Sequence, residues 1–136
     1  MPNRVLLVDD SDRIRKSVRA YLEKEFRFHV CGELADVHDA IEKVRDLKPD
    51  LIVLEVSVGI ELTQALKRIL PHIPIILFTA YEPLLQGFSP AEIGVDAVVA
   101  KDFGVSGLGK AVTSLFSRLP HEWPDNATRM AMHGKS

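Results

Sequence analysis

The sequence has little cysteine and few large aromatic residues, with one cysteine (Cys31), one tryptophan and two tyrosines. A single cysteine excludes an internal disulfide, so we expect a reducing compartment and a thiol that serves as a small core residue. No apolar run approaches the roughly 18 residues of a membrane span. The N-terminus also lacks a signal-peptide pattern. These absences predict a soluble, cytoplasmic protein without a membrane partner.

The sequence also lacks an excess of charge of one sign. It has 17 lysines and arginines against 19 aspartates and glutamates, for a net charge of -2. The basic residues are spread over several faces, and no basic helix-turn-helix follows residue 119. We therefore expect no nucleic-acid partner.

What the chain does have is a regular alternation of short apolar runs and helical patterns. Apolar runs without polar alternation indicate strands that are buried on both faces. The predicted strands are residues 5–8, 28–32, 51–54, 74–78 and 95–100. A helical pattern follows each one, which predicts an α/β domain with a parallel sheet and right-handed crossovers.

Helix-starting signals support this alternation. Ser11 or Asp12 and then Asp36 stand where N-caps are needed. Residues 89–92 read as a capping box with proline at the first helical position. From residue 120 to 136 the pattern is polar and irregular, so we expect one folded domain at 1–119 and a polar tail at 120–136 that carries no further domain.

Polar side chains follow the predicted strands where they end. The first strand ends on Asp9 and Asp10, the third on Glu55, the fourth on Thr79 and the fifth on Lys101. Since parallel strands end at one edge of a sheet, these side chains should meet. Three carboxylates repel one another unless a proton or a cation intervenes, and oxygen ligands suit Mg²⁺. A hydroxyl and an ammonium beside such a metal suit a phosphoryl group.

These motifs together resemble the receiver domain of bacterial response regulators. Residues 5–10 resemble the acidic-pair strand of that family, and residues 49–54 resemble the approach to its phospho-acceptor aspartate. Residues 78–80 resemble its pair of a hydroxyl residue followed by a small residue, and residues 94–101 resemble its closing strand with lysine. The resemblance implies a two-component phosphorelay and a flavodoxin-like (βα)5 fold with strand order 2-1-3-4-5.

The resemblance also implies roles for individual residues. In the family, the acidic pair and the acceptor hold Mg²⁺, and a histidine kinase donates the phosphoryl group. The implied magnesium ligands are Asp9, Asp10, Glu55 and the backbone carbonyl of Ser57. The implied phosphate-contacting residues are Thr79, Ala80 and Lys101.

Several positions depart from the family pattern. The acceptor position holds Glu55, and its extra methylene would crowd the metal and misplace the attacking oxygen. Residues 56–59 are shorter than the usual loop and have no proline. The switch aromatic is replaced by Val98, and the proline after the lysine by Asp102.

These departures predict a receiver-like domain that ordinary aspartyl phosphorylation does not switch. We expect it to act through protein–protein interaction, with a histidine kinase or downstream effector as partner, or as a homodimer. Glu55 could pair with Lys101 or Thr79 and hold a fixed, phosphate-mimicking state. Alternatively, a partner or metal alone could regulate the domain. We assign no catalytic residue and expect no enzyme activity.

The sequence is also compatible with two other functions. One is a phosphorylatable response regulator that uses Glu55 with Mg²⁺. The other is a metal-dependent phosphohydrolase that uses the D-x-D pattern of residues 10–12. Against the phosphohydrolase, the chain lacks a cap insertion and lacks an acidic pair following a strand after Lys101. Asp12 also fits better in the first turn of a helix.

Overall fold

A computed structural model describes residues 3–55, 60–80 and 89–117. The strands are β1 (Asn3–Val8), β2 (Phe28–Leu34), β3 (Leu51–Leu54), β4 (Ile75–Thr79) and β5 (Ala97–Ala100). The helices are α1 (Asp12–Phe26), α2 (Val37–Leu47), α3 (Ile60–Ile69), α5 (Pro90–Ile93), the 3-10 helix η1 (Lys101–Phe103) and α6 (Ser106–Ser117). None of the helices within these ranges has the length and apolar character that crossing a membrane requires.

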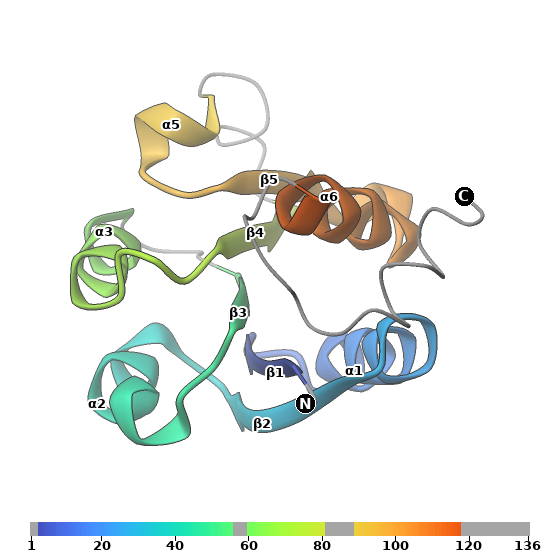
Figure 1. Cartoon of the computed structure of the whole chain (residues 1–136), viewed down its shortest axis with the longest axis horizontal. Helices are drawn as coiled ribbons and strands as arrows, with labels where there is room; N and C mark the ends of the chain where they lie inside the picture. The colour runs from blue at the N-terminus through green and yellow to red at the C-terminus, as the bar shows by residue number, and fades with distance from the viewer. Residues whose placement is uncertain (1–2, 56–59, 81–88, 118–136) are drawn as a thin grey trace.

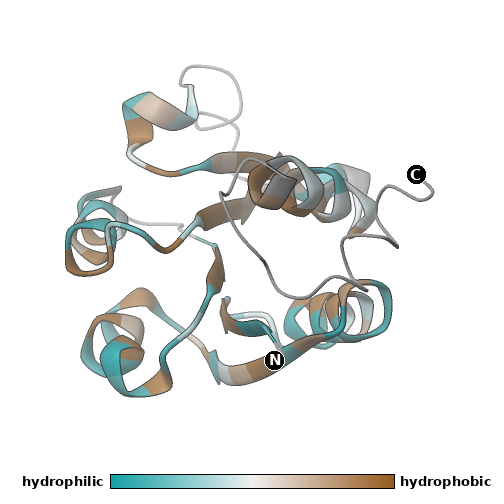
Figure 2. Ribbon diagram, viewed as in Figure 1, coloured by the Kyte–Doolittle hydropathy of each residue, from teal (hydrophilic) through white to brown (hydrophobic). Residues whose placement is uncertain are grey.

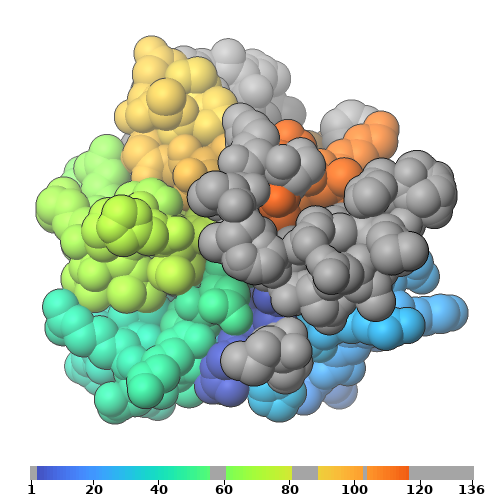
Figure 3. All heavy atoms as spheres, in the orientation of Figure 1, coloured from blue at the N-terminus to red at the C-terminus, as the bar shows by residue number. Residues whose placement is uncertain are grey.

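The strands form one parallel sheet in the order β2-β1-β3-β4-β5. This confirms the predicted flavodoxin-like fold and its strand order. Helices α1 and α6 cover one face of the sheet, and α2, α3 and α5 lie on the other (Figure 1). The space-filling view shows α2, α3 and α5 following one another along the second face (Figure 3).

The three central strands, β1, β3 and β4, are mostly apolar because both of their faces are buried. In β1, β3 and β4, alternate side chains enter two separate cores. Val5 and Leu7 join the core under α1 and α6, whereas Leu6 and Val8 join the core under α2 and α3. Brown, hydrophobic colour accordingly follows the strands, and teal marks the outer faces of the helices (Figure 2).

The predicted helix starts are confirmed. The Ser11 hydroxyl accepts a hydrogen bond from the Ile14 amide at 3.2 Å, and the Asp36 carboxylate accepts one from the Asp39 amide at 3.0 Å. Ser89 forms the full capping box with Glu92. Each contact satisfies an amide that the first helical turn leaves without an intrahelical partner.

Some boundaries differ from the predictions. Strand β2 runs on to Leu34, because Leu6, Leu7 and Val8 of β1 continue the pairing past a register shift. Strand β5 begins at Ala97, and η1 was not predicted. Cys31 is half-buried and packs against the core under α2 and α3. The tail predicted for residues 120–136 lies outside the described residues.

Candidate functional site

Asp9 lies directly after β1, at the carboxyl edge of the sheet, and only 6% of the residue is exposed. Its backbone amide donates to the Leu34 carbonyl at 3.0 Å, which fixes the main chain. Carboxylate oxygen Oδ1 accepts from the Ser11 amide at 2.8 Å, and Oδ2 lies 2.8 Å from Lys101 Nζ. The buried charge is therefore paired and hydrogen-bonded, as burial requires.

Glu55 follows β3, and its amide donates to the Val8 carbonyl at 2.8 Å. This bond places Glu55 beside Asp9, on the neighbouring strand. Carboxylate oxygen Oε1 lies 3.0 Å from Lys101 Nζ. The hydroxyl of Thr79, which is fully buried at the end of β4, donates to Oε2 at 3.1 Å. One carboxylate thus contacts the side chains of Thr79 and Lys101, two of the three residues that the family resemblance assigns to phosphate.

Lys101 forms ion pairs with the carboxylates of both Asp9 and Glu55. We call these two carboxylates the acidic corner. The lysine side chain is 18% exposed, against 7% for Asp9 and 13% for Glu55. Burial by itself lowers the pKa of Lys101, but hydrogen bonds from its ammonium to Asp9 and Glu55, with their negative charges, raise that pKa above its ordinary value. Lys101 therefore stays charged at neutral pH.

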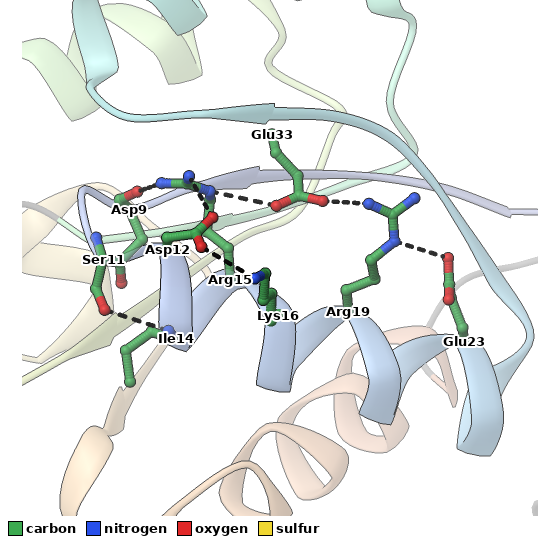
Figure 4. A network of polar contacts seen from close by, with 9 residues as sticks. All are labelled: Asp9, Ser11, Asp12, Ile14, Arg15, Lys16, Arg19, Glu23 and Glu33. Carbon is green, nitrogen blue, oxygen red and sulfur yellow. Dashed lines mark hydrogen bonds and ion pairs between the residues drawn. The ribbon is translucent and has the colours of Figure 1, made fainter.

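A second cation, Arg15 of α1, lies next to the corner (Figure 4). Its guanidinium donates to the backbone carbonyl of Asp9 and forms ion pairs with Glu33 at 3.3 Å and Asp12 at 3.2 Å. Glu33 of β2 also pairs with Arg19, one turn further along α1. Sequence analysis missed Arg15 and Glu33. The spacing of Arg15, one helical turn after the N-cap Ser11, placed it near the end of β1, but this spacing does not report the contact with Glu33 of β2.

Among the described residues, the predicted site residues Asp10, Ala80 and Val98 make no contact with this cluster through an ion pair or a side-chain hydrogen bond. Asp10 is exposed and has no ion pair or hydrogen bond among the described residues, and Ala80 is also exposed. Val98 is half-buried in β5, opposite Leu77, and packs against the core under α2 and α3. Ser57 is not among the described residues. The roles of these residues stay predictions.

In the arrangement described here, Lys101 and not a third acidic side chain lies against the two carboxylates of the acidic corner. No group of three His, Cys, Asp or Glu side chains within the described ranges is placed to hold a metal ion. Lys101 instead occupies the position between the two buried carboxylates. Were Mg²⁺ to bind, Asp9, Asp10 and Glu55 would supply its oxygen ligands and the ion would neutralise them. That site stays a prediction.

The core side of the corner leaves little free space. A cavity of about 10 Å³ lies beneath it, lined by Asp9, Arg15 and Glu55 and by apolar residues of β1, α1, β3 and β4. A volume of this size holds roughly one water molecule. The Glu55 carboxylate therefore has little room to withdraw from Lys101 and Thr79 into the core.

The chain is similar to curated response regulators of staphylococci. It is 32% identical over 121 residues to the response regulator protein VraR of Staphylococcus saprophyticus, covering 86% of this chain and 58% of that protein. It is 31% identical over 116 residues to VraR of Staphylococcus aureus, covering 82% of this chain and 56% of that protein. The chain thus spans a little over half the length of these relatives.

Solved structures share the fold at lower sequence identity. A CheY-like receiver domain protein from Methanospirillum hungatei superposes with a TM-score of 0.75 at 21% identity, covering 86% of this chain and 95% of that one. RcsB from Salmonella enterica serovar Typhimurium, bound to promoter rprA, superposes with a TM-score of 0.72 at 23% identity. That match covers 85% of this chain and 62% of the RcsB chain.

The RcsB structure contradicts the prediction that nucleic acid is not a partner, because this structural relative is solved bound to promoter DNA. That prediction rested on the net charge and the scattered basic residues of the present chain. These features do not report on DNA-binding residues in other parts of a longer relative. The family model for the response regulator receiver domain matches residues 5–113, which is most of the chain. With the five-stranded fold and the strand-end residues already described, this match shows that the chain belongs to the response regulator receiver domain family.

Proposed function

We propose that this receiver domain is held in one signalling state by Glu55 and is not switched by aspartyl phosphorylation. The observation that carries the proposal is the double contact of the Glu55 carboxylate, 3.0 Å from Lys101 and 3.1 Å from Thr79. The family resemblance gives both of these donors to phosphoryl oxygens. A carboxylate that already accepts from both makes the contacts that a phosphoryl group would make.

The same contacts oppose phosphoryl transfer to Glu55. Attack on a donor requires a carboxylate oxygen that is accurately aligned with the phosphorus atom and free to react. Here one oxygen faces an ammonium and the other a hydroxyl. Bonds to charged groups are stronger than neutral hydrogen bonds, so releasing either oxygen is costly.

The proposed output is binding to a protein partner, either a histidine kinase or a downstream effector. Receiver domains are signalling modules, and we assign no catalytic residue here. DNA is a second candidate for a longer protein that carries such a domain, because RcsB is solved bound to promoter DNA. In that case, the affinity of the longer protein for DNA should not require a phosphoryl donor, which a binding titration with and without donor would test.

The direct test is the intact mass of the protein after incubation with Mg²⁺ and a small acyl-phosphate donor. The wild-type protein should gain no phosphoryl group, whereas Glu55→Asp should gain one if residues 56–59 permit the reaction. Absence of uptake in both proteins would show that residues 56–59 disable the site as well. A phosphoryl adduct on Glu55 would contradict the proposal and favour the phosphorylatable alternative.

A further inference from the structure

We infer that Arg15 is a positioning residue, which fixes the direction of the Asp9 carboxylate by holding the main chain of the turn at residues 9–11. The turn joins β1 to α1 and carries one of the two carboxylates of the acidic corner. The inference deepens the proposed function and rests on it for its biological meaning. Its physical basis is a set of contacts that ends on the backbone of the turn.

Arg15 holds this turn at both of its ends. Its backbone amide donates to the Ser11 carbonyl at 3.0 Å, as the first turn of α1 requires, and its guanidinium donates to the Asp9 carbonyl. Between these two contacts, the Ser11 amide donates to Asp9 Oδ1 at 2.8 Å. The turn therefore fixes the direction of the Asp9 carboxylate, whose other oxygen pairs with Lys101.

Acidic side chains hold the guanidinium in its place, as Figure 4 shows. Nη2 lies 3.2 Å from Asp12, and Nε lies 3.3 Å from Glu33 Oε1. The Asp12 side chain is 65% exposed, so its ion pair is weak, whereas the Glu33 side chain is only 22% exposed. Glu33 of β2 is therefore the partner that determines where the Arg15 side chain lies.

Arg19 holds Glu33 from the other side. Its Nη1 pairs with Glu33 Oε2, and its Nε lies 3.2 Å from Glu23, one turn further along α1. Within the described part of the chain, the two arginines share the Glu33 carboxylate, but of the two only Arg15 donates to Asp9. Arg19 therefore provides a matched control for the contact with the turn.

Loss of the guanidinium would free the Asp9 carbonyl just after β1. Rotation of the main chain at this point would move the Ser11 amide away from Oδ1 and turn the carboxylate away from Lys101. The turn should open in this way without unfolding of the sheet, because segments of a protein open locally at a lower free energy than the core. Arg15 thus acts on the acidic corner through Asp9.

Amide hydrogen exchange followed by NMR tests the inference in wild type, Arg15→Met and Arg19→Met. The Ser11 amide reports its bond to Asp9, and the amide of Val112, which is buried in α6, reports global unfolding. We expect Arg15→Met to accelerate exchange at Ser11 by at least about fivefold, because the turn opens locally. Arg19→Met should leave the Ser11 rate within about twofold of wild type.

An unchanged Ser11 rate in a folded Arg15→Met, with faster exchange at Val112 alone, would show a merely structural role and overturn the inference. Equal acceleration at Ser11 by both substitutions would also overturn it, because the shared pair with Glu33 would then be the cause. Arg15→Lys is the second variant if the methionine protein does not fold. It should accelerate Ser11 exchange as well, since one ammonium does not reproduce the fork of a guanidinium.

Phosphoryl uptake is measured separately, by intact mass, so the two proposals can fail independently. An unchanged Ser11 rate in Arg15→Met, together with no phosphoryl uptake by wild type, would overturn this inference and leave the proposed function standing. Faster Ser11 exchange together with a phosphoryl adduct on Glu55 would support the positioning role and contradict the proposed function.

Discussion

Lys101 determines the charge balance of the site because its single ammonium contacts two carboxylates on different strands. Without it, Asp9 and Glu55 would be two neighbouring negative charges with little access to water. Such a pair is destabilising, and removing one partner of a buried ion pair usually costs more than the pair itself contributes. Sequence analysis identified Lys101, Glu55 and Thr79 correctly as neighbours, because each directly follows a strand of one parallel sheet.

The pH dependence of stability should reveal this role. The pKa of Lys101 is raised above its ordinary value of 10.5, so its charge stabilises the folded state fully below that value. The stabilisation is lost as the pH rises through the pKa of the folded state. We expect Lys101→Met to lower the free energy of unfolding by about 2 to 4 kcal/mol at neutral pH.

Urea denaturation of both proteins at several pH values measures this difference. It should be constant between about pH 6 and pH 9 and should shrink above about pH 10.5. A difference that instead disappears as the pH falls toward neutrality would show that the ammonium does not stabilise the folded state.

Among the elements, α1 is connected to the site through Arg15, which contacts the Asp9 carbonyl after β1 and Glu33 of β2. Arg15 was not expected from the sequence to belong to the site, because arginine side chains are usually exposed. Its side chain is only 16% exposed. Contacts between elements of this kind depend on where β2 passes α1, which helical periodicity does not report.

Arg15→Met should therefore destabilise the domain by about 1 to 3 kcal/mol, the usual effect of losing hydrogen bonds to a charged group. Arg13→Met is the matched control, because Arg13 is exposed on the same helix and should change stability by less than about 0.5 kcal/mol. Thermal unfolding of both variants measures the effect. Equal destabilisation by the two substitutions would show that the contacts of Arg15 are not responsible.

Helices α1 and α6 approach closely at one glycine. A Cβ atom added at Gly109 would overlap the hydroxyl of Tyr21. Gly109→Ala should cost about 1 to 3 kcal/mol by overpacking, even though alanine favours a helix. In a Tyr21→Phe background, the nearest ring carbon lies 3.2 Å away, so the cost should fall. A double-mutant cycle measures the coupling, and additive effects would argue against this contact.

Local signals explain which element boundaries sequence could predict. Ser11, Asp36 and Ser89 were correct because an N-cap bonds to an amide within its own first turn. The start of β5 was wrong by two residues because a distant contact sets it. Asp96 bonds back to Ile75 of β4 through both its amide and its carboxylate. Such pairing across the sheet leaves no trace in a single stretch of sequence.

Over the whole molecule, the strand order and the edge that carries the site followed from five apolar runs and the residues that end them. The partner prediction failed at the same scale. The net charge of this chain reports nothing about residues outside it, and the match with VraR covers only 58% of the length of that relative. The fold therefore could be predicted from pattern, whereas the output of a longer signalling protein could not.

We propose that Glu55 holds the domain in one state that a phosphoryl group does not change. Amide NMR spectra of the wild-type protein, with Mg²⁺ and then with beryllofluoride as a phosphoryl mimic, test it most directly. We expect no saturable shift at the Thr79 and Lys101 amides when beryllofluoride is added, because Glu55 already contacts both side chains. Saturable shifts at those two amides, absent with Mg²⁺ alone, would contradict it.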